Sequence, residues 1–242
     1  MREPRDRRDA IHALVDTAVR RFAPAGRFAK HFARGKLRYD PLYLTLLRRG
    51  VIPDGVRLLD LGCGQGVFFA LLLAAREQSR AGRWPAGWPS PPSRFRLRGI
   101  EVRAAPVRRA RVALGSDAEL EQLDLRVARV VPSDLIALLD VVHYLEPEAQ
   151  DRLLRQIADA LAPGGLLLMR VGDVTARFAA RLTWAVDHFV TLARGAFVPQ
   201  FHRRTVPQWL AELDRLGLQA SAEPMSEGTP FANVLFVARK AG

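Results

Sequence analysis

Three glycines stand at alternate positions directly after an apolar run that ends in an acid. Residues 58–66 read LLDLGCGQG, so that Asp60 precedes Gly62, Gly64 and Gly66. A turn of this kind between a strand and a helix brings backbone N–H groups and the positive end of the helix to one point. The segment therefore predicts a binding site, and the question is which ligand it holds.

Neither of the common pyrophosphate-binding turns fits this spacing. In the dinucleotide fingerprint G-x-G-x-x-G, Gly62 and Gly64 match the first two glycines, but Val67 occupies the third position and the third glycine comes one residue early. A P-loop requires G-K-S or G-K-T at the end of its loop, and none occurs. What the segment does match is D-x-G-x-G-x-G.

The pattern D-x-G-x-G-x-G resembles motif I of the class I S-adenosylmethionine-dependent methyltransferases, and the resemblance extends over residues 56–171, roughly half of the chain. It implies S-adenosylmethionine as the cofactor, with Asp60 near its methionine amino group. Gly62, Gly64 and Gly66 would let the backbone approach the ligand, because a Cβ there would collide with it. The helix start at Gly66 would favour the methionine carboxylate.

Acids stand at the ends of the following strands, in the order that the family requires. Glu101 ends the second strand, where a carboxylate can accept hydrogen bonds from both ribose hydroxyls. It lies 35 residues after Gly66, against the roughly 20 of a compact unit, but leaving out an insertion at 79–94 reduces the separation to 19. Asp124, after the third strand, would lie beside the adenine amino group. Asp140, after the fourth, would line the cofactor and face the acceptor.

The resemblance thus implies a set of cofactor-contacting residues at four strand ends: Asp60, Gly62, Cys63, Gly64, Gly66, Glu101, Val102, Asp124, Leu125 and Asp140. Cys63 stands between two glycines, and we expect it to pack rather than to act as a nucleophile, because no base is evident for it. We predict no metal site.

Histidines are the candidate general bases. Methyl transfer from a sulfonium is an in-line displacement, so a base is needed only if the acceptor loses a proton, as a phenol or an enol does. His143, three residues after Asp140, is the best-placed candidate, because histidine titrates near neutral pH. Alternatively, His143 only shapes its loop by hydrogen bonding. His31 and His202 are weaker candidates.

The residues after the fourth strand bear on the kind of acceptor. They read LDVVHYL and lack the N-P-P-Y-type signature of amino-group methylation, so they look like those of small-molecule methyltransferases that act on oxygen or carbon. Tyr39 and Tyr144 would position an aromatic acceptor, or they fill the core. An aromatic-rich cap at 178–201 is consistent with an apolar acceptor.

Three segments, FARGKLRYDPLY, RWPAGWPSPP and GTPFANVLFVAR, are similar to bacterial methyltransferases associated with aryl polyene pigment pathways. In such pathways an aromatic head group carried on an acyl carrier protein is methylated. This resemblance implies a phenolic acceptor and an acidic acyl carrier protein as a partner.

The elements that must hold these residues alternate between strand and helix. We expect strands at 56–61, 95–102, 120–125, 135–142, 166–172, 218–225 and 233–240. We expect helices at 7–22, 42–49, 67–77, 105–114, 147–161, 174–194 and 205–216. The alternation predicts an α/β fold: a doubly wound, mostly parallel, seven-stranded Rossmann-like sheet with an antiparallel last strand and helices on both faces.

We divide the chain into an N-terminal helical lid, residues 1–50, and a class I methyltransferase domain, residues 51–242. The domain carries a Pro- and Trp-rich insertion at 79–94 and a helical cap at 174–204. The insertion either packs its two tryptophans back onto the domain or forms a wall over a pocket, and its residues favour neither interpretation.

The formal net charge is +12, from 37 cationic and 25 acidic residues. Only Lys30, Lys36 and Lys240 are lysines, and so much arginine beside abundant Ala, Leu, Gly and Pro indicates a GC-rich coding bias. Such a bias would spread positive charge over the surface. The alternatives are an RNA methyltransferase, which needs a basic face, and an acidic protein partner steered by the charge.

The composition limits the class of protein. Hydrophobic residues make up 49% and charged residues 26%, which is unlike a disordered chain. The single Cys63 excludes an internal disulfide framework. No apolar run reaches the roughly 18 residues of a spanning helix, and the N-terminus lacks the apolar core of a secretory signal. We expect a cytoplasmic protein.

Overall fold

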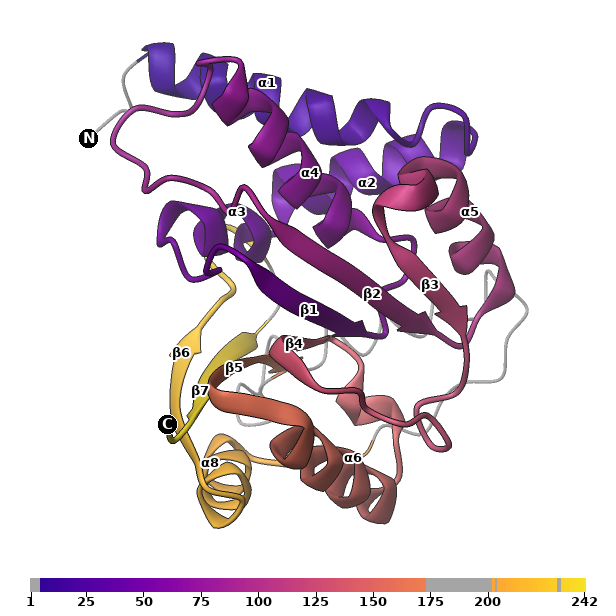
Figure 1. The fold of residues 1–242 in the computed structure, drawn as a ribbon, viewed down its shortest axis with the longest axis vertical. Coiled ribbons are helices and arrows are strands. Elements are labelled where there is room, and N and C mark those ends of the chain that lie inside the picture. The colour runs from indigo at the N-terminus through magenta and orange to yellow at the C-terminus, as the bar shows by residue number, and fades with distance from the viewer. Residues whose placement is uncertain (1–4, 173–201, 203, 230–231) are drawn as a thin grey trace. The chain divides into compact units, whose positions relative to one another are not determined.

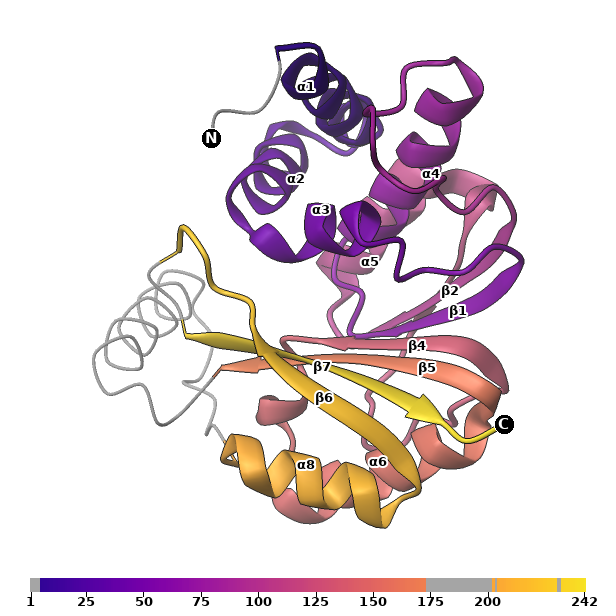
Figure 2. The same ribbon diagram turned by 90° about the vertical axis from the view of Figure 1, so that its left-hand side faces the viewer.

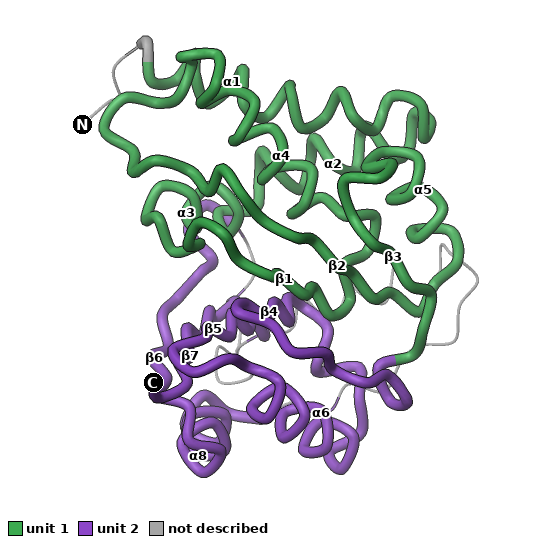
Figure 3. The backbone as a smooth tube through the Cα atoms, viewed as in Figure 1, with its two compact units in different colours: residues 1–124 green, residues 125–242 purple. Residues whose placement is uncertain are grey.

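The computed structural model describes residues 5–172, 202, 204–229 and 232–242 (Figure 1). The chain divides into two compact units, residues 1–124 and 125–242, which Figure 3 shows in different colours. Most of the cap predicted at 174–204, including its aromatic part at 178–201, lies outside the described residues, with only positions 202 and 204 inside them.

Three parallel strands form the sheet of the first unit: β1 (Val56–Leu61), β2 (Phe95–Glu101) and β3 (Glu119–Gln122), in the order β3-β2-β1. In β1 every residue except Arg57 is buried, as expected for the apolar run VRLLDL. Leu61 pairs with Ile100 and Glu101 with Gln122, so the carboxyl ends of the three strands reach the same edge.

Two helices connect these strands, α4 (Val67–Arg80) and α5 (Ala104–Leu114). α4 begins directly after Gly66, and each of its residues from Val67 to Ala75 is buried. A helix that is apolar all round is a core helix, so α4 fixes the position of the glycine turn that precedes it.

The helices α1 (Arg5–Arg20), α2 (Arg27–Tyr39) and α3 (Pro41–Arg48) belong to the same unit. α1 packs along α4, and the buried Gln78 amide of α4 donates a hydrogen bond of 2.7 Å to Thr17 Oγ1 of α1. Whether these helices act as a lid stays a prediction.

Sequence reasoning assigned no helix to the region of α2. The helix buries only Ala29, Ala33 and Leu37, which are small or widely spaced and give a weak apolar pattern. Apart from Gly35, the rest of α2 is aromatic or basic, and those residues are exposed or half-buried.

The Pro- and Trp-rich insertion packs against α1. α4 takes in its first two residues, and Trp84 and Trp88 then meet edge to face with ring centres 5.7 Å apart. Arg7 Nε of α1 donates to the Ala86 carbonyl at 3.1 Å. Both indoles are half-buried, and a role for the insertion as a pocket wall stays a prediction.

Four strands form the sheet of the second unit: β4 (Ser133–Leu139), β5 (Leu161–Gly172), β7 (Asn233–Lys240) and β6 (Leu218–Pro224), in this order. β4 and β5 are parallel, and β7 is antiparallel to both β5 and β6, as predicted for the last strand. α6 (Pro147–Ala160) and α8 (Val206–Arg215) lie on one side of these strands (Figure 2). Thr205 caps α8, and Gln208 completes the capping box.

The seven strands follow the order β3-β2-β1-β4-β5-β7-β6, with β7 as the antiparallel strand. This order confirms the predicted mostly parallel, Rossmann-like α/β fold. Within the part of the chain that the structure describes, no helix combines the length and apolarity needed to cross a membrane.

Two strands end three residues earlier than predicted. β3 ends at Gln122, so Asp124 and Leu125 both lie beyond the strand. β4 ends at Leu139, because Asp140 adopts φ 61° and the short 3-10 turn η2 (Val142–Tyr144) follows. A positive φ takes a non-glycine residue out of the extended conformation.

β5 begins earlier than predicted, at Leu161. Its pairing with β4 shifts between Ser133↔Leu161 and Leu135↔Leu166. The PGG sequence at 163–165, which precedes the strand predicted at 166–172, is therefore an irregularity within β5.

Candidate active site

The glycine turn between β1 and α4 has a backbone that only glycine adopts easily. Gly62, Gly64 and Gly66 have φ of 87°, 56° and 76°. A Cβ on Gly66 would also lie 2.6 Å from Leu114 Cδ1, whereas a Cβ on Gly64 would meet no atom within 4 Å. Glycine is thus required by the turn itself, and the space over Gly64 is open.

Two buried carboxylates, Asp60 and Glu101, stand beside this turn, each 4% exposed. Asp60 is in β1 and Glu101 ends the neighbouring strand β2. Glu101 Oε2 accepts a hydrogen bond from the Gly64 N–H at 3.1 Å, and its Oε1 accepts from the backbone N–H and Nε of Arg103, both at 2.9 Å. Glu101 therefore ties the end of β2 to the glycine turn.

Asp60 lacks such partners. Burial, and secondly the negative charge of Glu101, raise the pKa of Asp60 to about 7. Among the described residues, no cation or hydrogen-bond donor meets its carboxylate. The electrostatics of the turn therefore favour a positively charged ligand group beside Asp60.

Cys63 packs instead of reacting. Its Sγ would be 2.7 Å from a Cβ on Gly99, so the thiol occupies the space that this glycine of β2 leaves. Burial, and then the charges of Asp60 and Glu101, raise the pKa of the Cys63 thiol. A raised pKa disfavours the nucleophilic thiolate.

Gln65 is a residue of the turn that the sequence did not single out. It is 4% exposed, and its Nε2 donates to the Ala29 carbonyl of α2 at 2.8 Å. The glycine turn is thus fastened to α2. No pattern marks such a bond, since its acceptor is a backbone carbonyl 36 residues away.

The remaining cofactor candidates of the first unit lie at or beyond its strand ends. Val102 follows β2 and is 52% exposed. Asp124 is half-buried, and the Leu123 N–H donates to the Glu101 carbonyl at 3.2 Å, which brings the chain before Asp124 next to Glu101. Leu125, which is buried, begins the second unit.

Asp140, at the end of β4, is held by an arginine that sequence reasoning missed. Arg170 of β5 is 1% exposed, and its Nε donates to Asp140 Oδ1 at 2.7 Å while its Nη2 binds Oδ2. The pair is bidentate, which fixes the orientation of both groups. A lone arginine within the apolar run LLLMRVG was the available signal, because a buried charge needs a partner.

The structure brings three of the acceptor-side candidates together in the second unit. His143 and Tyr144 are in η2, with ring centres 4.4 Å apart. The His202 N–H donates to the His143 carbonyl at 3.0 Å. His31 and Tyr39 belong to the first unit, where both are exposed on α2.

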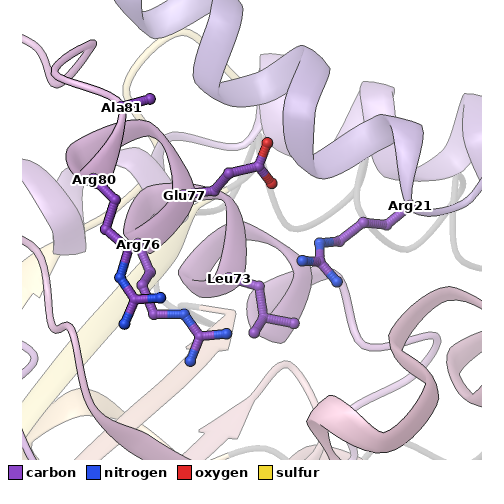
Figure 4. A pocket seen from close by; sticks show the side chains of 6 residues that line it. All are labelled: Arg21, Leu73, Arg76, Glu77, Arg80 and Ala81. Atoms are coloured by element: carbon purple, nitrogen blue, oxygen red, sulfur yellow. The ribbon is translucent and has the colours of Figure 1, made fainter.

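A hollow of about 400 Å³ lies at the other end of α4 (Figure 4). Arg21, Arg76 and Arg80 line it beside Glu77. Asp117 pairs with Arg21 at 3.0 Å and with Arg76 at 3.7 Å, so much of the positive charge is already compensated. The hollow is formed by the C-terminal half of α4, whereas the glycine turn precedes the helix.

The comparisons with known proteins agree with this geometry. A family model described as a methyltransferase domain matches residues 29–217. The carboxy-S-adenosyl-L-methionine synthase of Chromohalobacter salexigens is 30% identical over 190 residues, 69% of this chain and 65% of the relative. The trans-aconitate 2-methyltransferase of Azoarcus sp. is 35% identical over 127 residues, 52% of this chain and 43% of the relative. The chain thus spans less than two thirds of the length of these curated relatives.

Among solved structures, an O-methyltransferase family protein from Burkholderia thailandensis superposes with a TM-score of 0.60 at 19% identity, covering 92% of this chain and 62% of that chain. This likeness concerns the fold. The chain belongs to the methyltransferase-domain family, and its fold is the class I, Rossmann-like fold of the S-adenosylmethionine-dependent methyltransferases.

Proposed function

We propose that this protein transfers a methyl group from S-adenosylmethionine to an oxygen or carbon atom of a small aromatic or polyketide-like acceptor. The observation that carries the proposal is the buried carboxylate of Asp60 beside the glycine turn, with its pKa raised to about 7. A cationic amino group is the partner that such a carboxylate needs. The residues of the turn therefore fit this cofactor.

Each cofactor contact has a residue suited to it. The ammonium of the methionine part would pair with Asp60, and its carboxylate would accept N–H groups at the start of α4. The ribose hydroxyls would donate to Glu101 in place of the Arg103 side chain, which is 59% exposed. We assign the remaining contacts to the backbone of the turn and to the strand ends: Gly62, Cys63, Gly64, Gly66, Val102, Asp124, Leu125 and Asp140.

When bound, S-adenosylmethionine supplies an electrophilic methyl group on its sulfonium. The chain has to orient the acceptor, exclude water and remove a proton where the acceptor carries one. His143 is our candidate for that base, with His202 and His31 as weaker candidates. The imidazole of His143 lies against the ring of Tyr144 at 4.4 Å, and Tyr144 is 46% exposed, so an aromatic acceptor has a ring to stack on.

The exposed face of α2 supports an aromatic acceptor. Phe28, Phe32 and Tyr39 are four and seven residues apart, which puts them on one face of the helix, and they are 52%, 41% and 70% exposed. The first two rings stack with centres 6.1 Å apart. The bond from Gln65 to Ala29 joins this helix to the glycine turn. The names of two similar proteins, a trans-aconitate 2-methyltransferase and an O-methyltransferase family protein, also support a small-molecule acceptor.

As a finer proposal, the acceptor is a phenolic head group carried on an acidic acyl carrier protein, as in aryl polyene pathways. The net charge of +12 supports an acidic partner, because opposite charge speeds association. The α2 face supports only the aromatic part of this proposal.

The test is methyl transfer from deuterium-labelled S-adenosylmethionine to a panel of phenols and enols, free and carrier-bound, read by mass spectrometry. Calorimetry on the same protein checks cofactor binding, with Glu101→Gln expected to weaken it. Glu121→Gln is the matched control, because Glu121 is a half-buried acid of β3 that pairs with Arg98. Absence of binding at millimolar cofactor refutes the proposal. A turnover of His143→Ala that equals wild type across about pH 6 to 9 removes the base role only.

A further inference from the structure

Gln150 is a fully buried amide that no part of the proposed chemistry uses. It lies in the first turn of α6 and is 0% exposed. Burying an amide has a cost unless it forms hydrogen bonds. The partners of Gln150 therefore indicate what the residue is for.

Those partners are three backbone carbonyls from two separate segments. Gln150 Nε2 lies 3.2 Å from the Val142 oxygen and 3.0 Å from the Leu145 oxygen, one on each side of His143 and Tyr144. The same nitrogen lies 2.8 Å from the His202 oxygen. A single amide nitrogen thus holds both ends of η2 and one residue far along the chain.

His202 is joined to the same turn a second time. Its N–H donates to the His143 carbonyl at 3.0 Å, while its own carbonyl accepts from Gln150. The backbone of His202 is therefore fixed on both sides, relative to His143 and to α6. The two histidines are held in one arrangement by these bonds.

The carbonyl oxygen of the Gln150 side chain forms none of these hydrogen bonds. Gln150 Oε1 is buried and has no hydrogen-bond partner in the described part of the chain. An unsatisfied buried acceptor costs about 1–3 kcal/mol, so the donor contacts of Nε2 have to offset it. An apolar side chain would avoid that cost but would remove the Gln150 donor from all three carbonyls. Among the residues that the structure describes, the Val142 oxygen alone of these three has a second donor, the Leu145 N–H at 3.1 Å.

We infer that Gln150 is a positioning residue, which holds His202 against the η2 turn and thereby sets where the His143 imidazole stands. The catalytic consequence rests on the proposed function, whereas the positioning itself does not. Gln150 touches neither cofactor nor acceptor in this assignment and acts through the two histidine segments.

The variant that isolates this role is Gln150→Glu, which keeps the shape but replaces the donor by a group that, when ionised, repels three carbonyl oxygens. Gln156→Glu is the matched control. Gln156 lies on the same helix, and its Oε1 accepts from the Val130 N–H at 3.2 Å, a role that a glutamate retains. Gln150→Met removes the donor without adding charge, should the glutamate prevent folding.

The measurement is amide hydrogen exchange of the full-length protein by NMR, with the histidine ring resonances recorded on the same samples. In Gln150→Glu and Gln150→Met we expect the His202 amide to exchange about tenfold faster, the equivalent of one hydrogen bond. The ring signals of His143 and His202 should shift, and those of His12 and His31 should not. Gln156→Glu should match wild type in both readouts.

A pH profile separates positioning from general loss of stability. A buried glutamate takes up a proton more readily than an exposed one, and the protonated form donates again. Turnover by Gln150→Glu should therefore recover as the pH falls, opposite to the loss expected from protonating a histidine base. His202 exchange and ring signals that stay unchanged in both Gln150 variants overturn the inference, whatever the outcome for cofactor binding.

Discussion

Asp60 is the residue whose ionisation is most altered by the fold. Its ordinary pKa is about 3.9, and burial with the nearby charge of Glu101 raises it to about 7. A carboxyl whose pKa is raised by folding favours the folded state below its ordinary pKa, and this contribution is lost as the pH rises through about 7. Without ligand, the first unit should therefore lose stability over that interval. A cation bound beside Asp60 reverses the effect.

Cofactor affinity should consequently depend on pH. Between about pH 5.5 and 7 the amino group of S-adenosylmethionine stays charged while Asp60 must lose a proton to bind it, so affinity should rise by up to tenfold per pH unit. Asp60→Asn should weaken binding roughly ten- to a hundredfold and remove the pH dependence. Calorimetry at several pH values measures both.

Asp54→Asn is the control for this series. Asp54 is an acid of the same unit, whose carboxylate caps Ser93 and Arg94 and whose pKa those bonds lower. Its replacement should leave the cofactor affinity and its pH dependence as in wild type. An affinity that is flat from about pH 5.5 to 7 in the wild-type protein contradicts the role given to Asp60.

At the scale of elements, the glycine turn offers a matched pair of substitutions. Gly66→Ala and Gly64→Ala both force a side chain into positive φ, which costs about 1–2 kcal/mol. Only at Gly66 does the new methyl also collide, with Leu114 at 2.6 Å. We expect Gly66→Ala to lower thermal stability clearly more than Gly64→Ala. Gly64→Ala should reduce cofactor affinity more than its small loss of stability explains. Its methyl would point into the open space beside the turn, which we assign to the cofactor. If both substitutions reduce cofactor affinity in the same proportion to thermal stability, this assignment is contradicted.

The turn after β4 depends on the pair between Asp140 and Arg170, and the two partners are not equivalent. The Arg170 side chain is 1% exposed, whereas that of Asp140 is 33% exposed. Removing the acid leaves a guanidinium in the interior, but removing the arginine leaves a carboxylate that water can reach.

Asp140→Asn should therefore destabilise the protein more than Arg170→Met does, although asparagine tolerates the φ of 61° at this position. Breaking a buried pair costs about 3–5 kcal/mol, and we expect Arg170→Met to fall below that range. Urea unfolding compares them, and the opposite order would contradict the argument.

How far the sequence predicts these elements depends on where the partners of each residue lie. The acids at 60 and 101 were predictable, because parallel strands end at one edge and the acids stand at those ends. The end of β4 was not, since Val141 and Val142 continue the apolar run while Asp140 already turns the chain. The contacts of Gln65 with Ala29 and of Gln150 with His202 leave no pattern, because their acceptors are backbone carbonyls of distant segments.

For the molecule as a whole, the net charge of +12 raises the alternative of a nucleic-acid surface. Many of the arginines are engaged locally, as in the pairs Arg21–Asp117 and Arg94–Asp54 of the first unit and Arg204–Asp151 and Arg215–Glu212 of the second. Such pairing is what a coding bias with compensating acids produces. We therefore expect a diffuse excess of charge instead of a continuous basic face.

A diffuse excess of positive charge binds nucleic acid through counterion release alone. Its affinity therefore falls as the salt concentration rises. We therefore expect binding to fluorescent single-stranded RNA and duplex DNA to be weak at low salt and absent by about 0.15 M salt, without preference for sequence. Fluorescence anisotropy at a series of salt concentrations measures the slope, and the acidic carrier protein of a pigment pathway serves as the competing ligand. Tight RNA binding that persists at physiological salt would instead support the RNA methyltransferase alternative, since only a concentrated set of phosphate contacts survives screening.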